Sequence, residues 1–344
     1  MINTTGSRAG GTAHNGEQSV IDVHSHPSIA PYRKMVRDID TLGPEQRFSH
    51  RTFFPPGLPE WTPEWALEVM ERERIGAQVL SLPDATVGLR GDLARRTARE
   101  INEAMADIVA RHPERFAAFA VLPHDDTDAT LAEIEYALDV LKLDGVCTTT
   151  HIRGSYLGDP AFDPWLAELH RRSAVLFVHP TLAVAADPKA PLYIEFCFDS
   201  TRMVINMVLS GAKRRFDGIK LISTHGGGTI PYISHRLETI EPLLGGGKLT
   251  SEGIAADLRS FYYDLTSCMA AVPLAAASRF ADPSKLLLGF DFPYAPASFI
   301  APEIDRFFAF DGLGQREKTM IAQDNALALF PRLASARRAP GGPR

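Results

Sequence analysis

Eight short apolar runs, separated by stretches with helical periodicity, constrain the fold of this chain more than any other feature of its sequence. Each run is a largely continuous apolar segment of about five to seven residues, which is typical of a strand buried on both faces of a parallel sheet. The runs are Val20–His24, Ala77–Leu82, Phe116–Leu122, Gly145–Thr149, Ala174–His179, Ile219–Thr224, Phe261–Leu265 and Leu286–Phe290. They predict eight buried strands.

Between these runs, apolar residues recur at spacings of three and four, which predicts amphipathic helices. The predicted helices are Glu64–Ile75, Leu93–Arg111, Ala129–Leu141, Asp163–Arg172, Thr201–Arg215 and Ser234–Leu244. Repeated alternation of strands and helices indicates an α/β fold with crossover connections. The number of runs fits a (β/α)8 TIM barrel, and a doubly wound open sheet is the alternative.

The composition excludes several other classes of protein. Of the 344 residues, 45% are hydrophobic and 23% are charged, which is ordinary for a globular protein and not for a disordered chain, a collagen or a coiled coil. The net charge of −6 is the wrong sign for neutralising phosphates, so we expect no nucleic-acid partner. No apolar run reaches the 18 or so residues of a membrane span, and we expect no membrane partner. Three widely spaced cysteines favour reduced thiols in a cytoplasmic protein.

Two tails are expected to flank one folded unit. Residues 1–18 contain almost no large apolar side chains and lack the apolar core of a signal peptide, so they predict a disordered tail. Residues 335–344 are basic and rich in Pro and Gly, and predict a flexible C-terminal tail. Residues 19–334 are then a single barrel domain. Within it, the stretch 30–63 is long and rich in Pro and aromatic residues, as are insertions that shape an active site.

Ionisable side chains stand at the ends of four of the predicted strands. His24 ends the first run and His26 follows it, His179 ends the fifth, His225 follows the sixth and Asp291 follows the eighth. In a parallel barrel the carboxyl ends of all strands meet on one face, where such enzymes carry out their chemistry. These five side chains are therefore expected to converge.

The His-x-His pair indicates a metal site. Side chains two residues apart on a strand point to the same side, so both imidazoles can bind one ion. A third histidine and one carboxylate would complete a set that suits zinc, with manganese or iron as alternatives. A lone histidine at a strand end is more often a polar residue satisfied by its neighbours, but four such strand ends together favour the metal site.

Three other features are less specific. The glycines that follow His225, Gly226 to Gly228, allow close approach of the backbone to a ligand or a positive φ after the strand, and their spacing is not that of a nucleotide loop. Asp22 shares the face of His24 and is either a partner of that ligand or a polar contact inside the barrel. His124 and His151 follow the third and fourth strands and have weaker claims to a functional role.

Four motifs together resemble the amidohydrolase superfamily, and more closely its Amidohydrolase 2 branch. They are Asp22-Val-His24-Ser-His26, Val178-His179-Pro180, His225-Gly-Gly-Gly and Leu288-Gly-Phe-Asp291-Phe-Pro293, in the family's order. The branch includes aminocarboxymuconate-semialdehyde decarboxylases, and residues 143–181 look especially like 6-methylsalicylate decarboxylases. The motifs identify the family and not a single substrate.

The resemblance implies a distorted (β/α)8 barrel of amidohydrolase type with one divalent metal, zinc first and manganese second. His24, His26, His179 and Asp291 match the family's metal ligands, and His225 matches its catalytic histidine. Arg236 matches an arginine that reaches the neighbouring subunit's substrate in family members, which are commonly homodimers or homotetramers. For a further substrate-binding arginine in the long loop, Arg47 and Arg51 are both candidates.

These assignments favour metal-dependent, non-oxidative decarboxylation of a hydroxylated aromatic or conjugated carboxylic acid. Asp291 would pass a proton to the ring carbon, and His225 would activate a water molecule or hold a substrate oxygen. Hydrolysis of a lactone or amide at the same site is the alternative reaction. An inactive barrel that only binds a ligand is a third interpretation, which metal analysis would separate from the other two.

Overall fold

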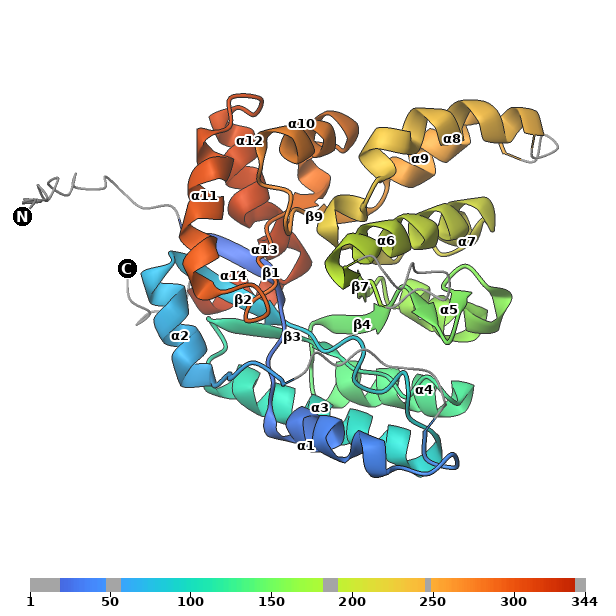
Figure 1. Cartoon of the computed structure of the whole chain (residues 1–344), viewed down its shortest axis with the longest axis vertical. Helices are drawn as coiled ribbons and strands as arrows, with labels where there is room; N and C mark the ends of the chain where they lie inside the picture. Colours follow the sequence, from blue (N-terminus) through green and yellow to red (C-terminus); the bar gives the residue numbers. More distant parts are fainter. Residues whose placement is uncertain (1–18, 48–56, 182–190, 245–248, 338–344) are drawn as a thin grey trace, which may run out of the picture.

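A computed structural model describes residues 19–47, 57–181, 191–244 and 249–337 of the chain. Its centre is an eight-stranded sheet in the order β1-β2-β3-β4-β7-β8-β9-β10, in which every neighbouring pair is parallel (Figure 1). The strands are β1 (Val20–Ser25), β2 (Ile75–Leu80), β3 (Phe116–Ala120), β4 (Gly145–Thr149), β7 (Val175–His179), β8 (Lys220–Ser223), β9 (Tyr262–Asp264) and β10 (Leu286–Leu287). Each of the eight predicted runs contains one of these strands or most of it.

The sheet closes on itself, because the chain beyond β10 runs alongside β1. The N–H of Val23 donates to the carbonyl of Leu288 at 2.9 Å, and the N–H of His26 donates to the carbonyl of Phe292 at 2.7 Å. Ser25 and Phe292 form a parallel bridge. The fold is therefore a distorted (β/α)8 barrel and not the open sheet, and its closing seam lies beside the histidines of β1.

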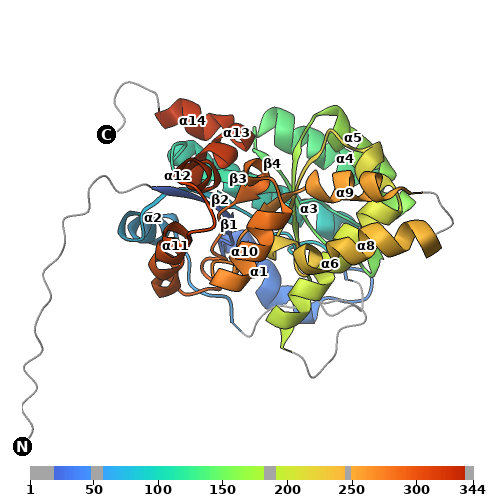
Figure 2. The ribbon, with the colours of Figure 1, turned by 90° about the horizontal axis from the view of Figure 1, so that it is seen from above.

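Helices surround the barrel, as two views at right angles show (Figures 1 and 2). They are α1 (Ala30–Asp38), α2 (Pro63–Arg72), α3 (Gly91–Arg111), α4 (Thr127–Glu135), α5 (Asp163–Arg171), α6 (Leu192–Leu209), α7 (Ala212–Arg215), α8 (Ile230–Leu244), α9 (Ser251–Arg259), α10 (Ala271–Phe280), α11 (Ile300–Ala309), α12 (Gln315–Thr319), α13 (Asn325–Leu329) and α14 (Pro331–Arg337). Ordinary capping starts several of them: the Thr62 side chain accepts a hydrogen bond from the N–H of Trp65, with Pro63 in the first turn of α2.

The six predicted helices are present with changed bounds, and helices α9 to α14 were not among the predictions. The helix predicted from Thr201 begins earlier, at Leu192. The predicted helix 201–215 is two helices, because Gly211 interrupts it with a φ of 75° between α6 and α7. The prediction 129–141 ends in a π-helical turn, Tyr136–Val140. Ile75, placed in the first predicted helix, belongs to β2. The long insertion also contains α1, and a short antiparallel hairpin, β5 (His151–Ile152) with β6 (Ser155–Tyr156), follows β4.

Aromatic side chains in the barrel interior pack against the histidines at the strand ends. Phe119 of β3 and Phe177 of β7 are fully buried and stack with ring centroids 5.1 Å apart. The ring of His24 meets Phe177 edge-on at 5.2 Å. The imidazole of His24 is therefore packed on a rigid layer, which fixes its position.

The expected N-terminal tail, residues 1–18, lies outside the described residues. So do residues 338–344 of the expected C-terminal tail. At the C-terminal end, α14 continues to Arg337, so the predicted boundary at residue 335 falls inside a helix. None of the helices in the described part of the chain combines the length and apolarity needed to cross a membrane.

Candidate active site

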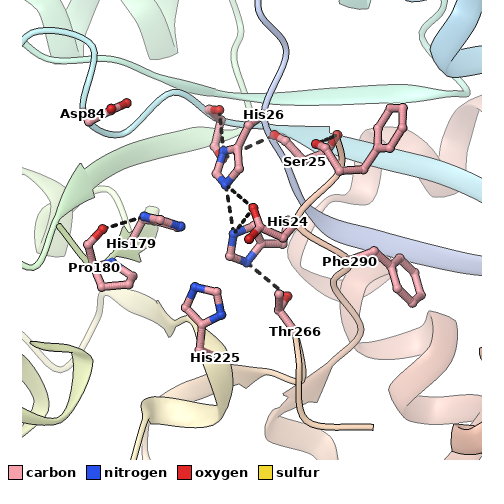
Figure 3. A network of polar contacts seen from close by, with 12 residues as sticks. His24, Ser25, His26, Asp84, His179, Pro180, His225, Thr266 and Phe290 are labelled. Carbon is pink, nitrogen blue, oxygen red and sulfur yellow. Dashed lines mark hydrogen bonds and ion pairs between the residues drawn. The ribbon is translucent and has the colours of Figure 1, made fainter. Parts of the chain in front are cut away.

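Four side chains from three strand ends bring their ligand atoms to one point, and Figure 3 shows the three histidines among them. His24, His26, His179 and Asp291 each offer one donor atom, and these atoms all lie within 4.8 Å of one another. The Nε2 atoms of His24 and His26 are 2.9 Å apart, and Oδ1 of Asp291 lies 3.2 Å from Nε2 of His26. The convergence that the strand ends predicted is thus present.

Hydrogen bonds on the far side of each imidazole turn its Nε2 toward this point. Nδ1 of His26 lies 3.0 Å from the carbonyl of Ser81, and Nδ1 of His179 lies 2.7 Å from the carbonyl of Pro180. A carbonyl only accepts hydrogen bonds, so the proton sits on Nδ1 and leaves the Nε2 lone pair free. Nδ1 of His24 is held in the same way by the carboxylate of Asp264 at 3.0 Å.

The donor set fits a divalent metal ion. Nε2 of His179 is buried and has no hydrogen-bond partner among the described residues, although an unpaired buried polar atom is costly. A cation at the point where the four donors meet would satisfy it. Three imidazole nitrogens and one carboxylate oxygen form a ligand set that suits zinc and other first-row divalent ions.

Electrostatics place His179 and Asp291 in the forms that bind a cation. Burial lowers the pKa of His179 well below its ordinary value, with neighbouring histidines adding to the effect, so its ring is neutral. Burial raises the pKa of Asp291, but the adjacent imidazoles of His26 and His24 outweigh it and hold that pKa well below the ordinary range. Asp291 is therefore a carboxylate. Burial opposes protonation of His24, yet Asp264 and Asp291 raise its pKa, so a proton there competes with a bound metal.

His225 lies beside the four donors but is not one of them. It begins the short helical turn η4 (His225–Gly227) after β8. Its ring centroid is 5.1 Å from that of His24 and 5.4 Å from that of His179, and its Nε2 is buried without a hydrogen-bond partner within the described ranges. Burial lowers its pKa to about 4, so the ring is neutral near pH 7 and can accept a proton or a hydrogen bond.

The backbone at His225 and Asp291 is left-handed, with φ of 53° and 58°. For residues with a side chain this conformation costs roughly 1–2 kcal/mol, and such strain gathers at functional sites. Each N–H is held in place, that of His225 by Oδ1 of Asp264 at 3.1 Å and that of Asp291 by the carbonyl of His24 at 2.9 Å. The three glycines after His225 also have positive φ, between 64° and 71°. Of the two interpretations of the glycine run, this confirms the positive φ after the strand.

Two buried carboxylates organise the site without joining the donor set. Asp22 Oδ1 accepts from the N–H groups of His24 and Phe290, and Oδ2 accepts from the side chain of Gln78. It therefore holds the backbone at His24 and at Phe290 and the side chain of Gln78, and not the ring of His24. Asp264, at the end of β9, is the residue that sequence analysis missed, although a carboxylate inside an apolar strand run was the available signal.

A polar wall lies beside His26. The hydroxyl of Tyr32 is 3.4 Å from both carboxylate oxygens of Asp84, which follows β2. Burial raises the pKa of Asp84 to about 6. The ring of Tyr294, three residues after Asp291, meets that of His26 at 5.7 Å. These side chains offer hydrogen-bond donors and acceptors next to the four donor residues.

The structure describes two of the three arginines that are expected to bind substrate. Arg236 is exposed on α8, and its side chain makes no hydrogen bond or ion pair with any described residue. The guanidinium of Arg47 bonds to the carbonyl of Ile39 and to Asp40 within its own loop. Arg51 falls outside the described residues. Their roles stay predictions.

The weaker histidine candidates have local partners. His124 Nε2 lies 3.1 Å from the hydroxyl of Thr148, and burial lowers its pKa to about 3. His151 Nδ1 accepts from the N–H of Gly154 in the hairpin that follows β4. Neither belongs to the cluster of four donors.

Comparison with known proteins places this barrel among enzymes of one kind. A family model described as Amidohydrolase matches residues 21–332. Decarboxylase yanB of Aspergillus niger is 35% identical over 91% of this chain and 87% of its own. The 6-methylsalicylic acid decarboxylase of Penicillium expansum is 33% identical over 83% of this chain and 95% of its own.

A solved structure shares the fold at lower identity. The 5-carboxyvanillate decarboxylase of Novosphingobium aromaticivorans, crystallised with manganese and 4-hydroxy-3-methoxy-5-nitrobenzoic acid, superposes with a TM-score of 0.78 and 19% identity. The match covers 92% of this chain and 97% of that one. At this identity the likeness concerns the fold.

Proposed function

The chain belongs to the amidohydrolase family, and from this membership and the geometry of its site we propose that it is a metal-dependent decarboxylase of a salicylate-like aromatic acid. One observation carries the proposal: the donor atoms of His24, His26, His179 and Asp291 converge in a chain whose relatives, over more than four fifths of its length, are decarboxylases. The substrate class follows from the printed name of the Penicillium relative, whose substrate is a hydroxylated benzoic acid.

We propose that these four residues hold one divalent ion, zinc by the preference of three imidazoles and a carboxylate, with manganese as the alternative. When bound, the ion supplies a fixed positive charge that orients an anionic substrate and stabilises negative charge in the transition state. Metal analysis of the purified protein, and reconstitution of the metal-free chain with each ion, distinguishes zinc from manganese.

Two side chains of the site are assigned to the movement of the proton. Decarboxylation replaces the carbon–carboxylate bond with a carbon–hydrogen bond, so the ring carbon gains one proton for each CO₂ released. Asp291 is proposed to relay it: the carboxylate first takes up a proton from the substrate hydroxyl or from a water molecule and then passes that proton to the ring carbon. His225, neutral and with a free Nε2, is proposed to hold a substrate oxygen or an activated water. The side chains of Tyr32, Tyr294 and Asp84 lie beside His26, on one side of the proposed metal site.

Product analysis over a panel of hydroxybenzoates tests the reaction. In D₂O the decarboxylase should release CO₂ and place one deuterium on the carbon that carried the carboxylate. In water labelled with ¹⁸O the aromatic product should contain no label. A product that carries the label, formed from an aryl lactone or amide, would instead establish the hydrolase alternative.

We also propose that the protein is a homodimer, or a homotetramer built from such dimers, located in the cytoplasm. Arg236 and Tyr232 lie four residues apart on one face of α8, and Tyr232 is 89% exposed. The nearby helix α6 adds Tyr193, which is 71% exposed. An exposed arginine beside exposed aromatic side chains is typical of an interface. The three free cysteines favour a reducing compartment.

Replacing Arg236 with alanine tests this interface. If its guanidinium binds the substrate carboxylate in the partner subunit, the R236A variant should raise KM about 10-fold or more, the value of a lost charge-assisted hydrogen bond, and keep its metal. R111A removes an exposed arginine on α3 and should leave KM unchanged. Mixed with a metal-deficient H24A chain, the R236A subunit should regain a KM close to that of the wild type, because its partner supplies an intact Arg236. No regain despite demonstrated subunit exchange would make Arg236 a surface residue.

A further inference from the structure

Asp264 contacts both the metal-ligand set and the catalytic histidine, one with each oxygen. Oδ2 lies 3.0 Å from Nδ1 of His24, and Oδ1 accepts the N–H of His225 at 3.1 Å. We propose that Asp264 is a positioning residue that couples the two, so that one carboxylate sets both the metal affinity and the placement of the catalytic imidazole. The inference rests on the proposed roles of His24 and His225.

The first contact determines which nitrogen of His24 faces the metal. Asp264 is fully buried, so water does not compete for its oxygens. A carboxylate only accepts hydrogen bonds, and the ring of His24 must therefore carry its proton on Nδ1. Nε2 is then left as a lone pair aimed at His26 and Asp291. The hydroxyl of Thr266 is 3.1 Å from the same Nδ1, but it can donate as well as accept and does not impose a tautomer.

The second contact holds a strained piece of backbone. The φ of His225 is 53°, and its N–H points at Oδ1 of Asp264, which also accepts the N–H of Thr266 at 3.1 Å. Two donors from two segments thus meet one oxygen. Without this acceptor both N–H groups would be buried and unpaired, and His225 would lose the bond that offsets its strain.

The packing around Asp264 is close. A Cβ atom at Gly289 would clash with the hydroxyl of Thr266, lie 2.7 Å from Cβ of His24 and lie 3.6 Å from Cγ of Asp264. Gly289 therefore leaves no room for a further side chain beside these three residues. A small displacement of Asp264 would be passed on to both histidines.

Asp22 is the matched comparison. It is equally buried, has the same side chain and contacts the same His24, but through the backbone N–H at 3.0 Å. Its replacement by asparagine would act on the backbone at the strand seam and leave the tautomer of the His24 ring unchanged. A general effect of removing a buried carboxylate should appear at both positions, whereas coupling through the ring should appear at Asp264 alone.

The decisive variant is D264N. Its amide oxygen must face the two N–H donors, so its NH₂ faces Nδ1 of His24 and moves the ring proton to Nε2, into the metal site. We expect metal dissociation constants about 10- to 100-fold weaker, the usual cost of losing the partner of a ligating histidine. They are measured without substrate, by competition of Zn²⁺ and Mn²⁺ with a chelator. D22N and T266V should stay within about 3-fold of the wild type, inside the context scatter for a ligand that keeps its partner.

D264A separates the second contact from the first. At saturating metal, D264N keeps an acceptor for the His225 N–H and should retain kcat within about 10-fold, while D264A should lose about 100-fold, the scale of a displaced acid–base group. D264S replaces D264A if the latter does not fold. Wild-type metal affinity in D264N, or equal losses in D264N and D22N, would overturn the first contact. Equal kcat in D264N and D264A would overturn the second. A wild-type chain that binds no metal would refute the proposed function instead.

Discussion

Replacement of His179 with alanine is expected to remove most of the bound metal and nearly all activity while the chain stays folded. His179 contributes one of the four converging donor atoms, and its Nε2 has no other partner within the described chain. Removal of a direct ligand must cost more than the roughly 10- to 100-fold in metal affinity that follows the loss of a ligand's hydrogen-bond partner. H24A should behave in the same way.

The measurement is metal content by elemental analysis after dialysis, together with circular dichroism and turnover with added metal. H170A is the control, because His170 lies on α5 and pairs with Asp217 at 3.6 Å, away from the cluster. The control should keep its metal and its activity. Full metal content and turnover in H179A would show that the ligand set is wrong.

The sequence predicts those residues of the site that stand at the ends of strands, because the strand pattern recurs along the chain. A strand that is buried on both faces of a parallel barrel consists mostly of apolar residues. A histidine or aspartate directly after such a run therefore indicates the end of the strand in the sequence. His24, His179 and Asp291 stand at such ends, and the parallel pairing brings the ends together without further information. The convergence of distant residues was therefore predictable.

Asp264 was harder to predict because its role depends on neighbours across the barrel. It lies in the same kind of apolar run as Asp22, and the two cannot be told apart by pattern. In the structure Asp22 holds backbone N–H groups, whereas Asp264 reaches the ring of His24. The difference arises from strand register and side-chain direction, which a single sequence does not specify.

The long insertion and the outer helices were harder to predict from the sequence for a different reason. The sequence indicates that residues 30–63 are an insertion, but α1 within it has only nine residues and begins without a side-chain cap, so it was not predicted. The function of Arg236 depends on a second subunit. Its exposed position on α8 is consistent with both a solvated residue and an interface residue. The periodicity of apolar residues along a helix does not indicate whether another subunit packs against its exposed face.

Replacement of His225 is expected to separate chemistry from metal binding. H225A should retain the metal, because the four donors are complete without it, and should lower kcat about 100-fold or more, the usual scale for a positioned acid–base group. Alanine removes the imidazole but also faces a φ of 53°, so backbone strain alone could slow the enzyme.

H225N resolves that ambiguity, since asparagine tolerates the left-handed conformation better than other residues with a side chain. If the imidazole performs the chemistry, H225N should bind metal as the wild type does and be nearly as slow as H225A. If His225 only shapes the loop, H225N should recover most of the wild-type turnover. Because the neutral ring lies 5.1 Å from His24 with a free Nε2, we expect the first result, and recovery by asparagine would contradict the assignment of His225 to proton transfer or to holding a substrate oxygen.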